Sequence, residues 1–173
     1  MKPELVPAEA KPEFDMFHYM ELSGETRLEQ GLLSRLEECW NEWLPHLKVF
    51  ELRQPKGADQ KSCLLVYLDK PVEQAVEAIW QSSPSDGLAC HNLAVAMVMS
   101  AAAELIPELA EGGCAPLPEI DGPTQKALKK MKLDWKDEGA LNRQYAVLTP
   151  KPYAGGCNIC YLQEKCPRSQ TRR

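Results

Sequence analysis

Three closely spaced cysteines near the carboxyl end constrain this chain more than any other feature. They follow a C-x2-C-x5-C pattern with a proline directly after the last cysteine, and they are Cys157, Cys160 and Cys166, followed by Pro167. A C-x2-C pair lets two thiolates turn toward one centre, and the longer gap returns a third thiolate from the next turn of chain. Gly155 and Gly156 precede the pattern and let the backbone approach an inorganic sulfide closely. The pattern therefore predicts a loop folded around a metal ion or an iron–sulfur cluster.

A complete four-cysteine site needs one more ligand, and Cys114 is the best candidate. Gly112-Gly113-Cys114 repeats the local arrangement Gly155-Gly156-Cys157, and Pro116 marks another irregular segment. The remaining cysteines fit hydrophobic positions, because free cysteine often behaves as a small buried apolar residue. They are Cys39 on an apolar helix face, Cys63 at the start of a strand expected to be buried, and Cys90 in a helix expected to be buried. We therefore predict that Cys114, Cys157, Cys160 and Cys166 bind the metal or cofactor, and that the other cysteines are structural.

Composition limits the class of protein. A chain of 173 residues and 19.4 kDa suits one domain with a proper core. The first residues lack the layout of a secretion signal, and no uncharged apolar run reaches the ~18–20 residues that span a bilayer. We therefore expect a soluble, cytoplasmic protein with no membrane partner. Seven cysteines in a reducing compartment indicate metal binding more than disulfides, and an odd number cannot pair fully.

The four cysteines also resemble a known motif. One upstream cysteine followed by C-x2-C-x5-C is similar to the [4Fe-4S] motif of RecB-type iron–sulfur nucleases, and the C-x2-C-x5-C core resembles part of the SPASM cluster domain. The resemblance covers Cys114 and about fifteen residues around Cys157–Cys166, and it implies a [4Fe-4S] cluster. The chain shows no convincing acidic-acidic-lysine constellation of the nucleases and no C-x3-C-x2-C motif of radical-SAM enzymes. The resemblance therefore implies the cofactor and neither parent activity.

Zinc is the main alternative to the cluster, because four thiolates also form a closed tetrahedral zinc site. Structural zinc ligands more often come as two C-x2-C pairs, whereas this chain has one such pair and two separately spaced cysteines. A third alternative is that these cysteines are ordinary thiols. Spacing and ligand softness favour iron–sulfur over both.

Hydrophobic periodicity predicts an α+β fold. Residues 1–15 contain three prolines and six charged side chains, which predicts a flexible tail. Residues 16–173 are then a single α+β domain, in which residues 111–173 form a loop-rich, cysteine-clamped region. The pattern predicts strands at 16–22, 49–53, 63–68 and 145–148, and helices after residues 23, 69 and 86. Up to residue 81 this order suits a ferredoxin-like or related small sandwich.

The sequence favours a redox role over a catalytic one. It contains no phosphate-binding loop, dinucleotide-binding turn, zinc-protease motif or serine-hydrolase motif, so we assign no catalytic residue. His91 follows Cys90, but neighbours on a helix do not face each other. Four cysteine ligands leave no open iron for a substrate. We therefore predict electron transfer, or a redox-linked role with a protein partner, through one [4Fe-4S] cluster.

The alternative function is a non-enzymatic module that binds protein or nucleic acid and has a structural iron–sulfur or zinc site. Residues 111–173 contain 11 basic and 7 acidic side chains, which is compatible with an anionic partner. Such a charge excess is more often a solvated surface, so it supports nucleic-acid binding only weakly.

Overall fold

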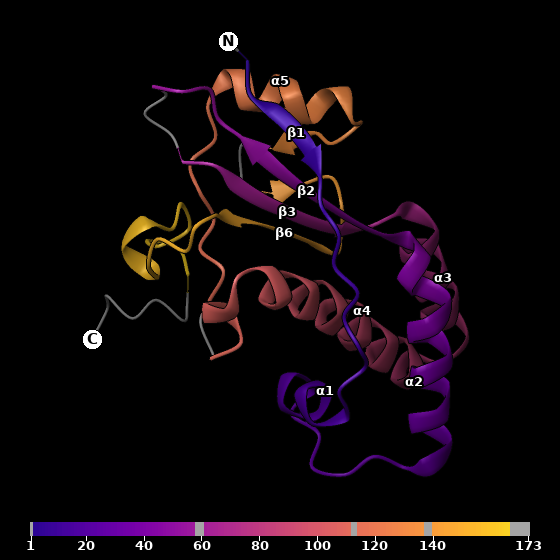
Figure 1. Ribbon diagram of the computed structural model, residues 1–173. Helices are drawn as coiled ribbons and strands as arrows, with labels where there is room; N and C mark the ends of the chain where they lie inside the picture. The colour runs from indigo at the N-terminus through magenta and orange to yellow at the C-terminus, as the bar shows by residue number, and fades with distance from the viewer. Residues whose placement is uncertain (1, 58–60, 112–113, 137–139, 167–173) are drawn as a thin grey trace.

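A four-stranded antiparallel sheet forms the centre of the molecule (Figure 1). The computed structural model describes residues 2–57, 61–111, 114–136 and 140–166. The strands lie in the order β1-β2-β3-β6, and they are β1 (Glu4–Pro7), β2 (Leu47–Arg53), β3 (Cys63–Leu68) and β6 (Ala146–Pro150). All six residues of β3 are buried, because the sheet is covered on both faces. This confirms the continuous apolar run at 63–68 as a central strand.

Helices cover one face of the sheet in two layers. The long helix α4 (Pro84–Leu105) packs against β3 and β6, and three further helices pack on α4. These are α1 (Met16–Ser23), α2 (Gln30–Trp43) and α3 (Lys70–Ser82). Leu64, Val66 and Leu68 of β3 point into this larger core, where they meet residues such as Leu93 and Met97 of α4.

A smaller core lies on the opposite face. Cys63, Leu65 and Tyr67 of β3 point toward it, and Leu128 of α5 (Gly122–Lys130) is fully buried there. A two-stranded hairpin of β4 (Trp135–Lys136) and β5 (Ala140–Leu141) follows α5. The single-turn helices are η1 (Leu44–His46), η2 (Pro107–Leu109) and η3 (Cys157–Ile159). Residues 111–173 are therefore not uniformly loop-rich, since α5 and β6 belong to the two cores.

The α4 helix is long and apolar enough to cross a membrane by length and composition. Half of its most apolar window is buried inside the protein. Core helices of globular proteins have the same length and composition, and α4 is the element on which the other helices of its face pack.

The α+β class predicted from the sequence is confirmed. Its topology is a related sandwich and not the split arrangement of a ferredoxin-like fold, because β1 and β2 are direct antiparallel neighbours although helices connect them. The strands predicted at 49–53 and 145–148 correspond to β2 and β6, with ends that differ by one to two residues.

Two predictions for the amino-terminal region were wrong. Residues 1–15 do not form a loose tail, because Glu4–Pro7 pairs with Phe50–Arg53 and the indole of Trp40 donates a hydrogen bond to the Pro12 carbonyl at 3.0 Å. Residues 16–22 form helix α1 and not a strand. The Asp15 side chain accepts hydrogen bonds from the backbone N–H groups of Phe17 and His18, and Gly24 ends the helix in the left-handed conformation.

Candidate metal centre

Two segments that are distant in the sequence meet through the backbone of Leu117. Its carbonyl accepts a hydrogen bond from the Tyr161 N–H at 2.7 Å, and its own N–H donates to Cys160 Sγ at 3.4 Å. The loop after α4 is thereby joined to the carboxyl-terminal cysteine segment, which lies beside β6 in Figure 1. An N–H group directed at a cysteine sulfur is a common feature of iron–sulfur sites, because it stabilises the thiolate.

The carboxyl-terminal segment folds back on itself in tight turns. Gly155 has φ +99°, a conformation that residues with side chains rarely adopt, and η3 starts at Cys157. The Cys160 N–H donates to the Cys157 carbonyl at 3.2 Å, and the Cys166 N–H donates to the Leu162 carbonyl at 2.9 Å. These turns bring all three cysteines of the C-x2-C-x5-C pattern to the same small region.

The four predicted ligands line one recess of about 920 Å³. Cys114 is exposed, and Cys157, Cys160 and Cys166 are partly buried. The recess lies between the cysteine segments, α4 and β6, with wall residues that include Val95, Met99 and Val147. Cys39, Cys63 and Cys90 do not line it. Gly112, Gly113 and Pro167, which belong to the sequence pattern, lie outside the described residues.

The thiols share the recess without converging on one point. Within the ranges that the structure describes, no three side chains of the His, Cys, Asp or Glu type are close enough together to hold a metal ion. No cysteine of the recess forms a disulfide. The donor set fits a [4Fe-4S] cluster or zinc, since both prefer soft thiolates. Binding of either would require the Cys114 loop and the 157–166 segment to close further around the recess.

Polar residues of α4 and of the segment before β6 complete the wall. His91 Nδ1 lies 3.2 Å from the Tyr145 hydroxyl, and burial raises the pKa of Tyr145 to about 12. Arg143 forms an ion pair with Glu73 of α3 at 3.1 Å, and Glu73 also accepts a hydrogen bond from the Gln144 N–H. His91, Arg143 and Gln144 all line the recess. Sequence spacing gave no indication of this set, because its members come from separate elements.

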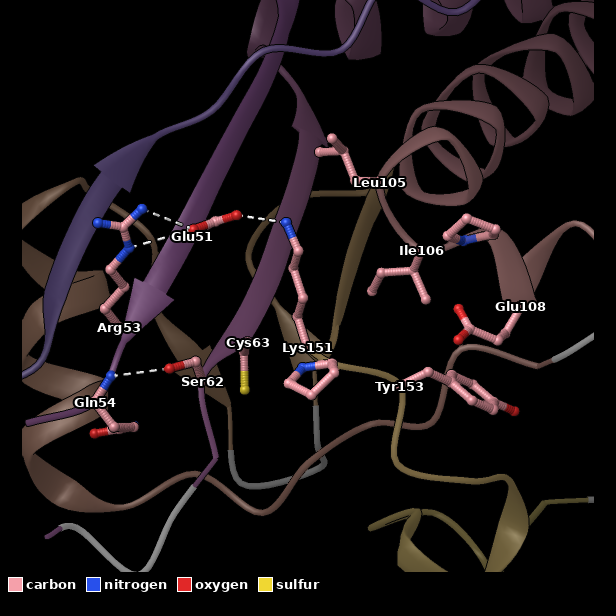
Figure 2. Close-up of a pocket in the computed structure, with 12 residues that line it drawn as sticks. Glu51, Arg53, Gln54, Ser62, Cys63, Leu105, Ile106, Glu108, Lys151 and Tyr153 are labelled. Carbon is pink, nitrogen blue, oxygen red and sulfur yellow. Dashed lines mark hydrogen bonds and ion pairs between the residues drawn. The ribbon is translucent and has the colours of Figure 1, made fainter. Parts of the chain in front are cut away.

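A second cavity of about 560 Å³ lies where β2 ends and β3 begins (Figure 2). The Glu51 carboxylate accepts hydrogen bonds from Lys151 and from Arg53, the latter at 3.0 Å. These two cations, with Lys151 the stronger cause, lower the pKa of Glu51. Cys63 also lines this cavity, but its thiol belongs to the smaller core on the opposite face of the sheet, where burial raises its pKa to about 11. Lys151 is a hundred residues from Glu51 in sequence, so the sequence analysis did not find this cavity.

Comparison with protein-family models, curated proteins and solved structures gives no match for this chain. The site therefore rests on its own residues, and its likeness to RecB-type and SPASM cluster motifs remains a prediction from the sequence.

Proposed function

We propose that the protein binds one [4Fe-4S] cluster through Cys114, Cys157, Cys160 and Cys166, and that it transfers electrons to or from a protein partner in the cytoplasm. The observation that carries the proposal is that these four cysteines, from two segments separated by 42 residues, line one recess. The three other cysteines are outside it.

The chemistry of the donor set supports electron transfer over substrate activation. Four cysteine ligands would occupy the outer coordination position of every iron, so no iron would be open to a substrate. The Leu117 N–H donates to Cys160 Sγ, and hydrogen bonds to sulfur are one of the levers by which a protein sets a cluster's reduction potential. The exposed Cys114 places the recess at the surface, where a bound cluster could exchange electrons with a partner.

Two apolar side chains beside the cysteines support a protein partner. Ile159 is 41% exposed and Tyr161 is 48% exposed, and both belong to the segment that carries Cys157 and Cys160. Exposed apolar groups at the edge of a redox site are typical of weak protein contacts.

The test is the metal content of protein purified without oxygen. We expect a brown protein with broad absorption near ~400 nm and about four irons and four sulfides per chain. Reduction with dithionite should bleach this absorption and give the paramagnetic signal of a reduced cluster. Stoichiometric zinc with no iron or sulfide would overturn the proposal and favour the structural site of a binding module. A [4Fe-4S] cluster that resists reduction would retain the cofactor and overturn the electron-transfer role.

A further inference from the structure

The recess that the four cysteines line also has a polar end, where β6 begins. The β6 strand starts on the side of the molecule where α3 lies and ends beside the carboxyl-terminal cysteine segment (Figure 1). Arg143 and Gln144 directly precede β6, and His91 of α4 lies next to them because its Nδ1 is 3.2 Å from the Tyr145 hydroxyl. The five residues of β6 place about 15 Å of strand between this end and the start of the cysteine segment.

An ion pair fixes the side chain of Arg143 at the polar end. Nη1 of Arg143 donates to one oxygen of the Glu73 carboxylate at 3.1 Å, and the other oxygen accepts from the Gln144 N–H at 2.8 Å. The Arg143 side chain is only 17% exposed. A guanidinium has five N–H donors in a planar fork, so the bond to Glu73 leaves donors for a second carboxylate. Arg143 is therefore held in place and can still bind an anion.

The charge of the recess favours a negative ligand. Among the described residues that line it there is no aspartate or glutamate, and Arg143 is the one side chain with a permanent charge. The chain as a whole is acidic, with 25 acidic and 20 basic residues. The second cavity differs in this respect, because Glu51 and Glu108 line it together with its cations.

An apolar wall leads from the polar end toward the cysteines. Val95 and Met99 follow His91 by four and eight residues on α4, so all three share one face of the helix. This face extends for about 12 Å from His91 toward the end of α4 that precedes the Cys114 loop. Val147 of β6 lines the recess as well. The recess thus combines a fixed cation at one end with an elongated apolar surface.

We propose that this recess binds a monocarboxylate with an unbranched aliphatic chain of medium length. Arg143 binds the carboxylate, and the chain lies along the wall of Val95, Met99 and Val147. A few polar groups in a mostly apolar cavity are the usual composition of a small-molecule site, in which the polar groups fix the orientation of the ligand. The inference shares the recess with the proposed cluster but does not rest on it, because no cluster ligand binds the carboxylate.

The experiment is isothermal titration calorimetry of the full chain with sodium octanoate at concentrations where it forms no micelles. Octanamide, which has the same chain and no charge, is titrated in parallel. We expect octanoate to bind at one site, and octanamide to bind about tenfold to a hundredfold more weakly, because hydrogen bonds to charged groups are the stronger ones. Iron and sulfide are measured on the same preparation, so absence of a cluster and absence of octanoate binding are separate results.

Variants of the ion pair separate ligand binding from folding. Arg143→Gln should weaken octanoate binding about tenfold to a hundredfold and leave octanamide binding unchanged. Glu73→Gln should retain octanoate binding, because the cation stays. Arg35→Gln is the matched control, since Arg35 forms an ion pair with Asp86 at 2.9 Å and does not line the recess.

The comparison of octanoate with octanamide on the unmodified chain tests the proposal even if Arg143→Gln does not fold. The proposal is overturned if octanoate does not bind, or if octanamide binds as tightly. It is also overturned if Arg143→Gln is folded and retains full octanoate affinity. Equal loss of octanoate binding in Arg143→Gln and Glu73→Gln would show that the ion pair is structural, and would overturn the role of Arg143.

Discussion

At the scale of single residues, Cys63 differs from the cysteines of the recess in its burial. Cys63 is 4% exposed, its thiol contacts the Lys61 carbonyl at 3.6 Å, and burial raises its pKa to about 11. A thiol in that state is a poor nucleophile and a poor ligand. The cysteines of the recess are partly buried or exposed, so a metal ion or cluster can reach them.

This division predicts the outcome of a serine scan. Cys114→Ser should lower the iron content as severely as Cys157→Ser, Cys160→Ser or Cys166→Ser, because each removes one ligand of the same site. Cys63→Ser is the matched control and should retain full metal content. Its cost in folding stability should be about 1–3 kcal/mol, toward the lower end, since the serine hydroxyl can donate to the Lys61 carbonyl. Iron and sulfide analysis with urea unfolding measures both effects. Full iron content in Cys114→Ser would show that the fourth ligand is a different residue.

The ion pairs of Glu51 predict a dependence of stability on pH. Lys151 and Arg53 hold the pKa of Glu51 below its ordinary value of 4.5, so the folded state favours the carboxylate more than the unfolded state does. The stabilisation is therefore present above about pH 4.5 and is lost as the pH falls through the lowered folded value. Lys151→Met should lower the free energy of unfolding at pH 7 by less than about 1 kcal/mol, because the groups are partly solvated.

The same substitution should have a smaller effect at a pH below the lowered folded pKa of Glu51, where the carboxyl group is protonated in both states. Lys126→Met, at an exposed position of α5, is the control. Urea unfolding at the two pH values measures the difference. If Lys151→Met lowered the free energy of unfolding equally at both pH values, Lys151 would act through packing and not through the charge of Glu51.

At the scale of secondary-structure elements, helices α3 and α4 approach each other closely at Gly87. A Cβ atom at this position would lie 2.6 Å from the Cα atom of Trp80, so the contact is with the backbone of α3. Because backbone cannot rotate away, Gly87→Ala should force α3 and α4 apart and lower stability by about 1–3 kcal/mol. Gly31→Ala is the matched control, since a Cβ atom there meets nothing within 4 Å.

Gly31 lies in the first turn of α2, where alanine should raise stability by about 0.5–1 kcal/mol. In thermal and urea unfolding, the free energy of unfolding should therefore fall in Gly87→Ala and rise in Gly31→Ala. A neutral or stabilising Gly87→Ala would show that the helices separate without cost at this point.

The elements also show where sequence reasoning succeeded and failed. The apolar run 63–68 and the proline-initiated helix after Asp69 could be predicted, because their signals are local and strong. The α1 helix was mistaken for a strand because residues 16–22 are too few to distinguish the two periodicities, while the Asp15 cap and Gly24 decided the conformation. The β1 strand was missed since its stability comes from pairing with β2, more than forty residues away.

At the scale of the whole molecule, the four cysteines of the recess could be grouped from spacing alone, but their surroundings could not. The contact of Leu117 with Cys160 and Tyr161, the His91–Tyr145 pair and the ion pair of Arg35 with Asp86 all join separate elements. Such contacts depend on how α4 crosses the sheet and α2, which a single sequence does not specify. The predicted clamped region 111–173 also divides in two. Leu128 of α5 and Leu148 of β6 are buried in the smaller core, whereas the cysteine segments add only partly buried residues to the two cores, such as Ala115, Leu117 and Tyr153.

This division determines what removal of the proposed cluster should do. Ligation of Cys114 and Cys157 would close a loop of 42 residues, at a cost in conformational entropy that binding in the native state would offset. The segments 114–119 and 151–166 contain few buried apolar residues, whereas Leu128 of α5 and Leu148 of β6 are almost fully buried. After treatment with chelator and oxidant, amide hydrogen exchange should therefore accelerate first in the two cysteine segments. Protection in α4, α5 and β3 should persist, because their cores do not include the recess thiols. Equal loss of protection everywhere would show that the fold is one cooperative unit, and unchanged exchange at 151–166 would show that the cluster does not hold this segment in place.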